Sequence, residues 1–234
     1  MTNKKAIICG VGPGNGMAIA RAFAKGGYDL ALLARNKQKL EGYAEDDGLK
    51  DVAVKTVAAD FSDMESTDKG VRQAIAELGG VDVLLYNASL YVAKGWRELT
   101  GPDLMGEVTV GAGSAVAAMR AAGETMADNG GGTIIATGGG SALDPTLVTE
   151  APGLAVTKGA MRNAVLALAP QYAKDDIYLA TVTIMGTVQA GTFYDPANIA
   201  DAIYEVAHGS ENERYTEVLY ASEQDKQEFL NRNA

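Results

Sequence analysis

The chain has 234 residues, with 30 acidic against 20 basic side chains and a formal net charge of −10. This balance argues against nucleic-acid and anionic-membrane partners, because both need a basic protein face. A single cysteine excludes an internal disulfide, and there is no secretory signal and no run of about 18 apolar residues. We therefore expect one cytoplasmic domain over residues 1–234, with no membrane partner.

Strand-like and helix-like segments alternate along the chain. Apolar runs predict strands at 5–10, 28–34, 52–58, 81–86, 132–137, 177–184 and 216–220. Helical patterns fall between them at 15–26, 37–46, 64–78, 103–128, 155–173 and 197–208, with a short one at 222–231. This alternation predicts an α/β fold with a Rossmann-like, doubly wound parallel sheet of about seven strands. Such sheets bind ligands at the carboxyl ends of their strands, so the residues after each strand are the first candidates for a site.

A glycine-rich turn joins the first predicted strand to the first predicted helix. Glycines allow positive φ and let a phosphate approach the main chain, with no Cβ in the way. The helix that follows offers free N–H groups and the positive end of its dipole, both of which favour an anion. The turn therefore predicts a pyrophosphate site formed by Gly10, Gly12, Pro13, Gly14, Asn15 and Gly16.

The second predicted strand is followed by Ala34, Arg35, Asn36 and Lys37. Sites selective for NAD usually place a carboxylate here to bind the ribose hydroxyls. A guanidinium instead binds a 2′-phosphate through charge-assisted, bidentate bonds, whereas a carboxylate would repel that phosphate. The sequence thus favours NADP(H) over NAD(H), with Arg35 and Asn36 at the phosphate. The alternative interpretation of Arg35 is a solvated residue at the start of a helix.

The third and fourth predicted strands also end in residues suited to a nucleotide. Asp60, next to Phe61, follows the third strand and could accept a hydrogen bond from the adenine amino group. Asn87 and Ala88 form a small, polar turn after the fourth strand that would pass under the cofactor. Four neighbouring strand ends therefore carry features of one dinucleotide site.

With these four features in order, the chain resembles the short-chain dehydrogenase/reductase family from residue 5 to about residue 230. The glycine turn, Asp60 and Asn87-Ala88 match its cofactor turn, adenine-binding acid and N-A-G segment, with Ser89 in place of the last glycine. The resemblance implies a nicotinamide cofactor and a small-molecule substrate. It also implies that Gly186 and Val188 lie beside the nicotinamide, although Met185 replaces the usual proline.

The alanine-rich helices predicted at 103–128 and 155–173 are the ones that relatives in this family commonly pair between subunits. Small residues allow helices to approach closely, and a homodimer or homotetramer is therefore expected. Packing against the sheet would also use alanine, so the composition alone supports this pairing without requiring it.

The residues that carry out catalysis in this family are only partly present in this chain. Family members that reduce carbonyls carry Tyr-x-x-x-Lys on the helix after the fifth strand, and here Lys158 is preceded four residues earlier by Leu154. Residues four apart share a helix face, so a leucine occupies the place of the proton donor. The family's serine falls on Ser141 if the alignment has no gap, and Val108-Thr109-Val110 stands where the helix-four asparagine is expected. Lys158 and Ser141 are the candidate catalytic residues, although Lys158 could serve only to bind the nicotinamide ribose.

Other side chains are weaker candidates for a proton donor. Tyr91, Glu150 and Tyr194 flank the expected substrate cleft. The only histidine, His208, falls at a helix end before a glycine, where the helix dipole favours it, and is expected to be neither a base nor a ligand. No cluster of cysteine, histidine and carboxylate has metal-ligand spacing, so no metal site is predicted.

Three functions remain open. The first is an NADP(H)-dependent oxidoreductase acting on a small molecule, whose proton comes from an unusual donor, from water or from the substrate itself. The second is a non-catalytic dinucleotide-binding regulator that kept the pocket and lost the acid. The third is a non-redox enzyme, an isomerase or a lyase, because a fold does not fix a reaction. Consumption of NADPH with a panel of substrates separates the first from the second, and product formation without cofactor turnover singles out the third.

Overall fold

The computed structural model describes residues 3–210 and 214–232. Within them, seven strands form one sheet in the order β3-β2-β1-β4-β5-β6-β7, and every neighbouring pair is parallel. The strands are β1 (Lys5–Cys9), β2 (Asp29–Ala34), β3 (Val54–Ala58), β4 (Val83–Tyr86), β5 (Gly132–Gly139), β6 (Ile177–Ile184) and β7 (Glu217–Tyr220). The strand order reverses between β1 and β4, the place at which doubly wound sheets bind ligands. The predicted Rossmann-like sheet is confirmed.

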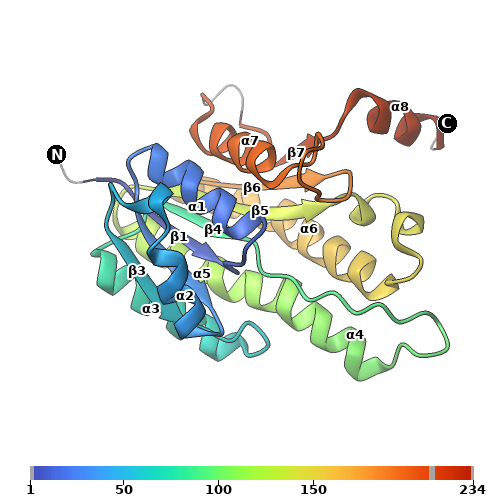
Figure 1. The fold of residues 1–234 in the computed structure, drawn as a ribbon, viewed down its shortest axis with the longest axis horizontal. Coiled ribbons are helices and arrows are strands. Elements are labelled where there is room, and N and C mark those ends of the chain that lie inside the picture. The colour runs from blue at the N-terminus through green and yellow to red at the C-terminus, as the bar shows by residue number, and fades with distance from the viewer. Residues whose placement is uncertain (1–2, 211–213, 233–234) are drawn as a thin grey trace.

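Helices cover both faces of this sheet (Figure 1). One face carries α1 (Asn15–Lys25), α2 (Lys37–Ala44) and α7 (Pro196–His208), and the other carries α3 (Met64–Leu78), α5 (Ser114–Asp128) and α6 (Pro152–Tyr172). Two further helices are α4 (Gly101–Val108), which precedes α5, and α8 (Glu223–Arg232), which follows β7. In Figure 1 the β4–α4 loop, the start of α6 and α8 extend on the side toward which the β5 arrow points, so they surround the carboxyl ends of the strands.

Each face of the sheet has its own buried core, because successive residues of a strand point to opposite faces. In β1, Ile7 packs with α3, α5 and α6, while Ile8 packs with α1 and α7. In β2, Leu33 belongs to the same core as Ile7, and Leu32 belongs to the same core as Ile8. Burial of one such side chain stabilises the fold by about 1.5–3 kcal/mol. Strands buried on both faces explain why the apolar runs in the sequence are nearly continuous.

The prediction of one continuous helix over 103–128 is wrong. The structure has α4, then a π-helical turn at Thr109–Gly113, and then α5. A π turn widens the helix and changes its backbone pairing, and here the Tyr86 hydroxyl donates a hydrogen bond to the Val110 carbonyl. Gly111 lies against the side chain of Thr157 on α6, so that a Cβ at this position would overlap the threonine methyl group. The close approach of α6 and the tyrosine hydroxyl account for the interruption.

Other helix ends differ from the expected ranges by a few residues, for identifiable reasons. The helix α4 begins at Gly101, earlier than expected, because Thr100 and Asp103 form a reciprocal capping box. The helix α6 begins at Pro152, since proline is well suited to the first position of a helix. No helix among the described residues is long and apolar enough to cross a membrane.

Candidate functional site

In the turn between β1 and α1, two glycines are tightly packed against neighbouring main chain and two others face open space. Gly10 has a φ of +86°, and a Cβ there would lie 2.5 Å from the backbone of Ala88. A Cβ on Gly16 would lie 2.7 Å from the main chain of the same turn. In contrast, a Cβ on Gly12 or Gly14 would have no neighbouring atom within 4 Å. Packing therefore requires glycine at positions 10 and 16. Gly12 and Gly14 leave the main chain accessible to a ligand.

The helix α1 begins directly behind this turn without a side-chain cap. Gly14 is its N-cap residue, and no side chain accepts a hydrogen bond from the first amide groups. Amides in the first turn of a helix have no acceptor within the helix. The side-chain oxygen of Asn15 is buried without a partner, but as an acceptor it does not itself attract an anion. The Met17 amide donates to the Gly12 carbonyl at 3.0 Å, so the donors left for a ligand are those of Asn15 and Gly16. Free donors at the positive end of a helix dipole suit an anion, and the residues present therefore fit the predicted pyrophosphate site.

A pocket of about 370 Å³ extends from this turn across the carboxyl ends of β1, β2, β3 and β4. The structure thus brings together residues that the sequence predicted from four separate strand ends. Six lining residues that are not among the predicted site residues stand one or two positions from a predicted one, or on the π turn. The lining is Gly10, Val11, Gly12, Ala34, Arg35, Asp60, Phe61, Ser62, Asn87, Ala88, Ser89, Leu90 and Val110.

The β2 and β3 ends of the pocket carry its charged residues. Asp60 accepts hydrogen bonds at Oδ1 from the Ser62 amide, at 2.9 Å, and from the Ser62 hydroxyl, at 2.8 Å. These bonds hold the pKa of Asp60 below its ordinary value, and the nearby charge of Arg35 adds to the effect. Arg35 is exposed at the mouth. Asn36 caps α2, since its Oδ1 accepts from the Lys39 amide at 2.9 Å.

Asn87 connects the floor of the pocket to two strands. Its side-chain amide donates to the Gly10 carbonyl at 2.9 Å, and its own backbone N–H donates to the Cys9 carbonyl at 2.8 Å. The Thr137 hydroxyl lies 3.3 Å from the Asn87 Oδ1 and donates to it. Asn87 therefore fixes the glycine turn against β5, which is a positioning role that its place in the sequence did not reveal.

Beyond this floor, α6 forms a wall at the end of β5. Lys158 is half-buried, and its Nζ donates to the Thr137 carbonyl at 2.8 Å. The side-chain stem of Lys158 lies beside Gly139, where a Cβ would be 3.4 Å from its Cγ. Leu154 stands one helical turn earlier, is also half-buried, and shares the face of Lys158. The wall therefore offers an amine and an aliphatic side chain.

Burial lowers the pKa of Lys158 from its ordinary 10.5 to about 8. Between these two values the unfolded chain binds a proton that the folded protein does not, so the destabilisation caused by burying this charge falls as pH rises through that window. At pH 7 it is charged in both states, and its burial is a cost. We expect Lys158→Met, without cofactor, to be more stable than the parent by about 1–3 kcal/mol at pH 7.

The same comparison at pH 10 should show a smaller difference, because the parent's lysine is then mostly neutral when folded. Urea unfolding of both proteins at the two pH values measures the effect. A stability difference that stays constant between pH 7 and pH 10 would show that Lys158 keeps an ordinary pKa.

The remaining predicted site residues lie just after β5 and just after β6. Ser141 is buried in a short 3₁₀ turn, Gly140–Ala142, that follows β5, and Gly139 is the residue beside Lys158. Gly186 lies under the ring of Tyr194, which a Cβ at 186 would overlap, and Val188 is exposed. These two residues do follow β6, as the sequence placed them. No contact among the described residues gives Ser141 a defined role.

Hydrogen bonds engage the polar atoms of Tyr194, a weaker proton-donor candidate, and of His208, which was expected to be neither a base nor a ligand. The Tyr194 hydroxyl donates to the Asp225 carboxylate and accepts from the Ser222 amide at 3.1 Å. The ring of His208 contacts the Tyr204 carbonyl at 2.6 Å and the Tyr28 hydroxyl at 2.9 Å. Since a carbonyl only accepts, Nδ1 of this histidine carries the proton. His208 is the last residue of α7, as expected.

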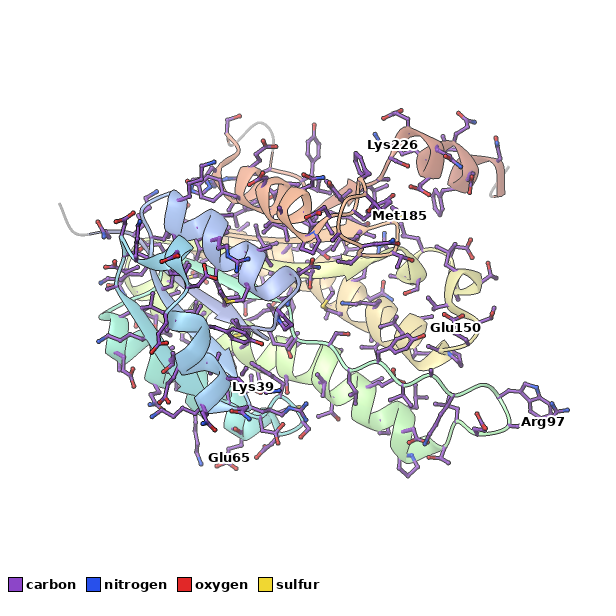
Figure 2. All side chains as sticks on the ribbon, in the orientation of Figure 1. Lys39, Glu65, Arg97, Glu150, Met185 and Lys226 are labelled. Carbon is purple, nitrogen blue, oxygen red and sulfur yellow. The ribbon has the colours of Figure 1, made fainter. Side chains whose placement is uncertain are left out.

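Tyr91 and Glu150 are both exposed and lie next to each other. The Tyr91 hydroxyl in the β4–α4 loop lies 3.5 Å from Oε1 of Glu150, which Figure 2 labels beside the start of α6. The loop is held close by Glu107, a buried residue that the sequence analysis missed. Its Oε1 accepts from the Val92 amide at 3.2 Å, while Oε2 has no hydrogen-bond partner and touches Gly153. Burial raises the pKa of Glu107.

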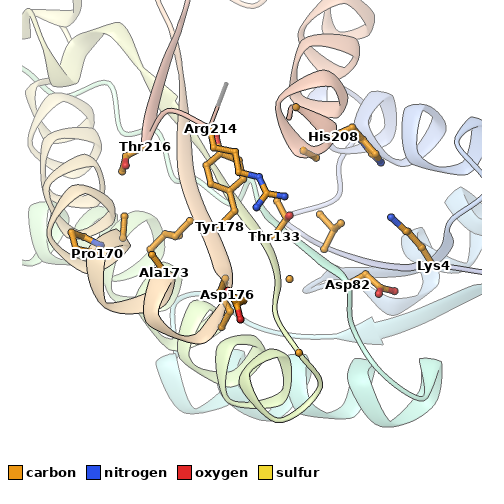
Figure 3. A pocket seen from close by; sticks show the side chains of 18 of the residues that line it. Lys4, Asp82, Thr133, Pro170, Ala173, Asp176, Tyr178, His208, Arg214 and Thr216 are labelled. Carbon is orange, nitrogen blue, oxygen red and sulfur yellow. The ribbon is translucent and has the colours of Figure 1, made fainter. Parts of the chain in front are cut away.

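A larger cavity, of about 770 Å³, lies at the opposite edge of the sheet (Figure 3). Its lining includes Lys4, Asp82, Thr133 and Ile177, which stand at or just before the amino ends of β1, β4, β5 and β6. Ligands of parallel sheets bind at the carboxyl ends, so the smaller pocket is the better candidate site. No group of three or more metal-binding side chains occurs in the part of the chain that the structure describes.

Comparison with known proteins agrees with this geometry. An uncharacterized oxidoreductase of Mycobacterium tuberculosis (strain CDC 1551 / Oshkosh) is 32% identical over 136 residues, which cover 58% of this chain and about half, 52%, of that protein. L-Sorbose reductase from Gluconobacter frateurii, solved with NADPH and L-sorbose, is 25% identical, with a TM-score of 0.83 over 93% of this chain and 95% of its own.

A metagenomic short-chain oxidoreductase solved in complex with NADP is 21% identical, with a TM-score of 0.83 over 94% of this chain and 97% of its own, and shares the fold. A family model described as short chain dehydrogenase matches residues 4–193, the part that holds the glycine turn, the pocket and the α6 wall. This chain belongs to the short-chain dehydrogenase family.

Proposed function

We propose that this protein is an NADP(H)-dependent oxidoreductase that acts on a small molecule. The observation that carries the proposal is the 370 Å³ pocket, which joins an uncapped, glycine-lined helix start to an exposed arginine after β2. Related folds that were solved with NADP or NADPH support the cofactor. A cytoplasmic homodimer or homotetramer, paired through α5 and α6, completes the proposal. Val116 and Val156 leave apolar surface exposed on these two helices.

Each part of the pocket has a distinct task in this proposal. The amides around Gly12, Gly14 and Asn15 bind the pyrophosphate, and Arg35 binds the 2′-phosphate. Asp60 accepts from the adenine amino group with the carboxylate oxygen that Ser62 leaves free. When bound, the nicotinamide supplies or takes up a hydride. These residues only bind and orient the dinucleotide. Selectivity for NADP(H) over NAD(H) therefore depends on Arg35 at the β2 end of the pocket.

Lys158 and the segment 186–188 enclose the nicotinamide end. The ammonium group of Lys158 binds the ribose hydroxyls there while it donates to the Thr137 carbonyl. No hydroxyl or carboxyl group stands at position 154, so the reaction takes its proton from another donor, from water or from the substrate itself. Ser141 and Lys158 remain the proposed catalytic residues. A dinucleotide-binding regulator without activity is the second candidate, and the leucine at 154 is the observation that favours it.

Arg35→Ala should weaken NADP⁺ binding roughly 10- to 100-fold and leave NAD⁺ binding nearly unchanged. Charge-assisted hydrogen bonds to a phosphate contribute about 1.5–3 kcal/mol, and only NADP⁺ has this phosphate. Isothermal titration calorimetry with both dinucleotides measures the change.

The matched control is Lys25→Ala, which removes one positive charge at the other end of α1. It should leave both affinities unchanged. If Arg35→Ala binds NADP⁺ as tightly as the parent, or if the parent prefers NAD⁺, the assignment of Arg35 is wrong.

A further inference from the structure

The segment 186–194 after β6, which includes the residues proposed to enclose the nicotinamide, is anchored by the side chain of Tyr194. Tyr194 is 8% exposed, and its ring lies directly against Gly186 at the other end of the segment. A Cβ at position 186 would overlap this ring, so the close approach requires glycine. The Gln189 amide also donates to the Tyr194 carbonyl at 3.1 Å. The position of the segment therefore depends on where the Tyr194 ring is held.

The hydroxyl of Tyr194 joins this segment to the first turn of α8. It donates to the Asp225 carboxylate and accepts from the Ser222 amide at 3.1 Å. The Ser222 hydroxyl donates to the same carboxylate oxygen, and the bonds from Ser222 and Tyr194 hold the pKa of Asp225 below its ordinary value. The carboxylate is therefore charged at pH 7. A hydrogen bond to a charged group is stronger than one between neutral groups.

A second set of contacts ties the segment to the end of β7. The Tyr220 hydroxyl donates to the Phe193 carbonyl at 2.8 Å, and the two rings stack with their centroids 4.9 Å apart. Just before the segment begins, the Met185 amide donates to the Tyr220 carbonyl at 3.0 Å. The C-terminal part of the chain thus contacts the segment at both of its ends.

The middle of the segment is exposed to solvent. Residues 187–193 are all exposed, and Val188 is 42% accessible. Gly191 has a φ of +75°, and its amide donates to the Asp195 carboxylate at 2.7 Å. Exposed segments with few buried contacts belong to the least stable parts of a fold. The contacts at the two ends therefore decide where the middle of the segment lies.

The helix α8 lies beside the ends of β5 and β6. Figure 2 labels Met185, directly after β6, and Lys226 on α8. Of residues 223–231, Asp225 and Phe229 are half-buried and the others are exposed. These two residues share one helix face, so α8 contacts the protein through the face that also accepts from Tyr194. The small cavity on this face, of about 30 Å³, is lined by Asp144, Leu147, Met185, Asp225, Glu228 and Phe229.

We infer that Tyr194 is a positioning residue that couples the docking of α8 to the binding of the nicotinamide half of the cofactor. It acts through residues 186–188, which its ring and its bond to Asp225 hold in place. The inference rests on the proposed function. Coupling between two sites is reciprocal, so bound NADP(H) stabilises docked α8 by the same factor by which docked α8 strengthens NADP(H) binding. The adenosine half of the cofactor, at the ends of β2 and β3, is not coupled to α8.

Binding of two ligands separates this role from a merely structural one. NADP⁺ has the nicotinamide half, and adenosine 2′,5′-bisphosphate lacks it. Tyr194→Phe keeps the ring against Gly186 and removes the bond to Asp225. In calorimetry it should weaken NADP⁺ binding about threefold to tenfold and leave the bisphosphate unchanged. Asp225→Ala should have the same effect, whereas Asp225→Asn keeps an oxygen that can accept from Tyr194 and should retain most of the NADP⁺ affinity.

Tyr178→Phe is the matched control, because it also removes the hydroxyl of a buried tyrosine. Tyr178 is 9% exposed, and its hydroxyl donates to the Tyr215 carbonyl at 2.8 Å. It lies at the amino end of β6, away from the segment, so both affinities should stay unchanged. The Asp225 variants provide a further safeguard, since α8 lies outside the sheet and its core.

Hydrogen exchange of the α8 amides gives a readout that does not depend on affinity. NADP⁺ should slow exchange of residues 223–231 in the parent by a factor similar to the loss of affinity in Tyr194→Phe, and the bisphosphate should not slow it. In Tyr194→Phe, this protection by NADP⁺ should be lost.

Three results would overturn the inference. NADP⁺ could leave exchange in α8 of the parent unchanged, Tyr194→Phe could weaken both ligands equally or neither, or Tyr178→Phe could weaken NADP⁺ as much as Tyr194→Phe does. A parent that binds no NADP⁺ at all would instead contradict the proposed function, on which the inference depends.

Discussion

Gly14→Val is expected to lose NADP(H) binding while the protein stays folded. A Cβ at this position meets no atom within 4 Å, so a side chain has room there in the folded protein. The branched side chain would occupy the space in which the pyrophosphate meets the amides of α1. Loss of two charge-assisted hydrogen bonds corresponds to roughly a 10²–10⁴-fold weaker complex. Calorimetry with NADP⁺ and far-ultraviolet circular dichroism together measure the outcome.

Gly10→Ala is the matched control for this experiment. Its Cβ would lie 2.5 Å from the Ala88 backbone, and the φ of +86° disfavours any side chain. This variant should lose about 2–5 kcal/mol of stability in urea unfolding. A folded Gly14→Val protein that binds NADP⁺ as tightly as the parent would mean that the glycine loop is only a structural turn.

Leu154→Tyr is expected to create carbonyl reductase activity that the parent lacks. Residue 154 lies one turn before Lys158 on the same helix face, so a tyrosine there would place its hydroxyl near the lysine amine. The charged amine would lower the pKa of that hydroxyl and make it a better acid. A general acid contributes about 10²–10⁴-fold in rate. Reduction of 1-tetralone with NADPH should rise by a factor in this range or somewhat below it.

The lower end of the range is expected because Val108-Thr109-Val110 replaces the helix-four asparagine of the family. Leu154→Phe is the matched control, since it adds the ring without the hydroxyl and should give no increase. Brisk ketone reduction by the parent that survives Lys158→Ala would contradict this account of the wall. Tyr91, Ser141 and Glu150 would then be the first residues to substitute.

The sheet and the glycine turn were predictable because they depend on local patterns. Continuous apolar runs identify strands that are buried on both faces, and the alternation with helices imposes parallel pairing. The residues after four strands could then be assigned to one site without knowing any distance. Gly10 illustrates this well, because the left-handed conformation that the turn requires is available mainly to glycine.

Features that depend on packing between distant segments were not predictable. The π turn at Thr109–Gly113 arises from a contact with Thr157 and a hydrogen bond from Tyr86. A count of thirteen residues back from position 154 selects Ser141, and the sequence could not show that Gly139, the last residue of β5, lies against the stem of Lys158. The burial of Glu107 likewise follows from the approach of α6, which no local pattern in α4 reveals.

The central claim is that the pocket at the ends of β1 to β4 binds NADP(H) beside an α6 wall that has Leu154 in the place of a tyrosine. A crystal structure of the protein with NADP⁺ tests it most directly. The account predicts the pyrophosphate on the amides around Gly14, the 2′-phosphate on Arg35, and the nicotinamide beside Lys158 and Leu154. It further predicts that no hydroxyl or carboxyl group other than the Ser141 hydroxyl lies at hydrogen-bond distance, about 3 Å, from the substrate position over nicotinamide C4. A dinucleotide bound elsewhere, or an acidic side chain at that position, would contradict the account.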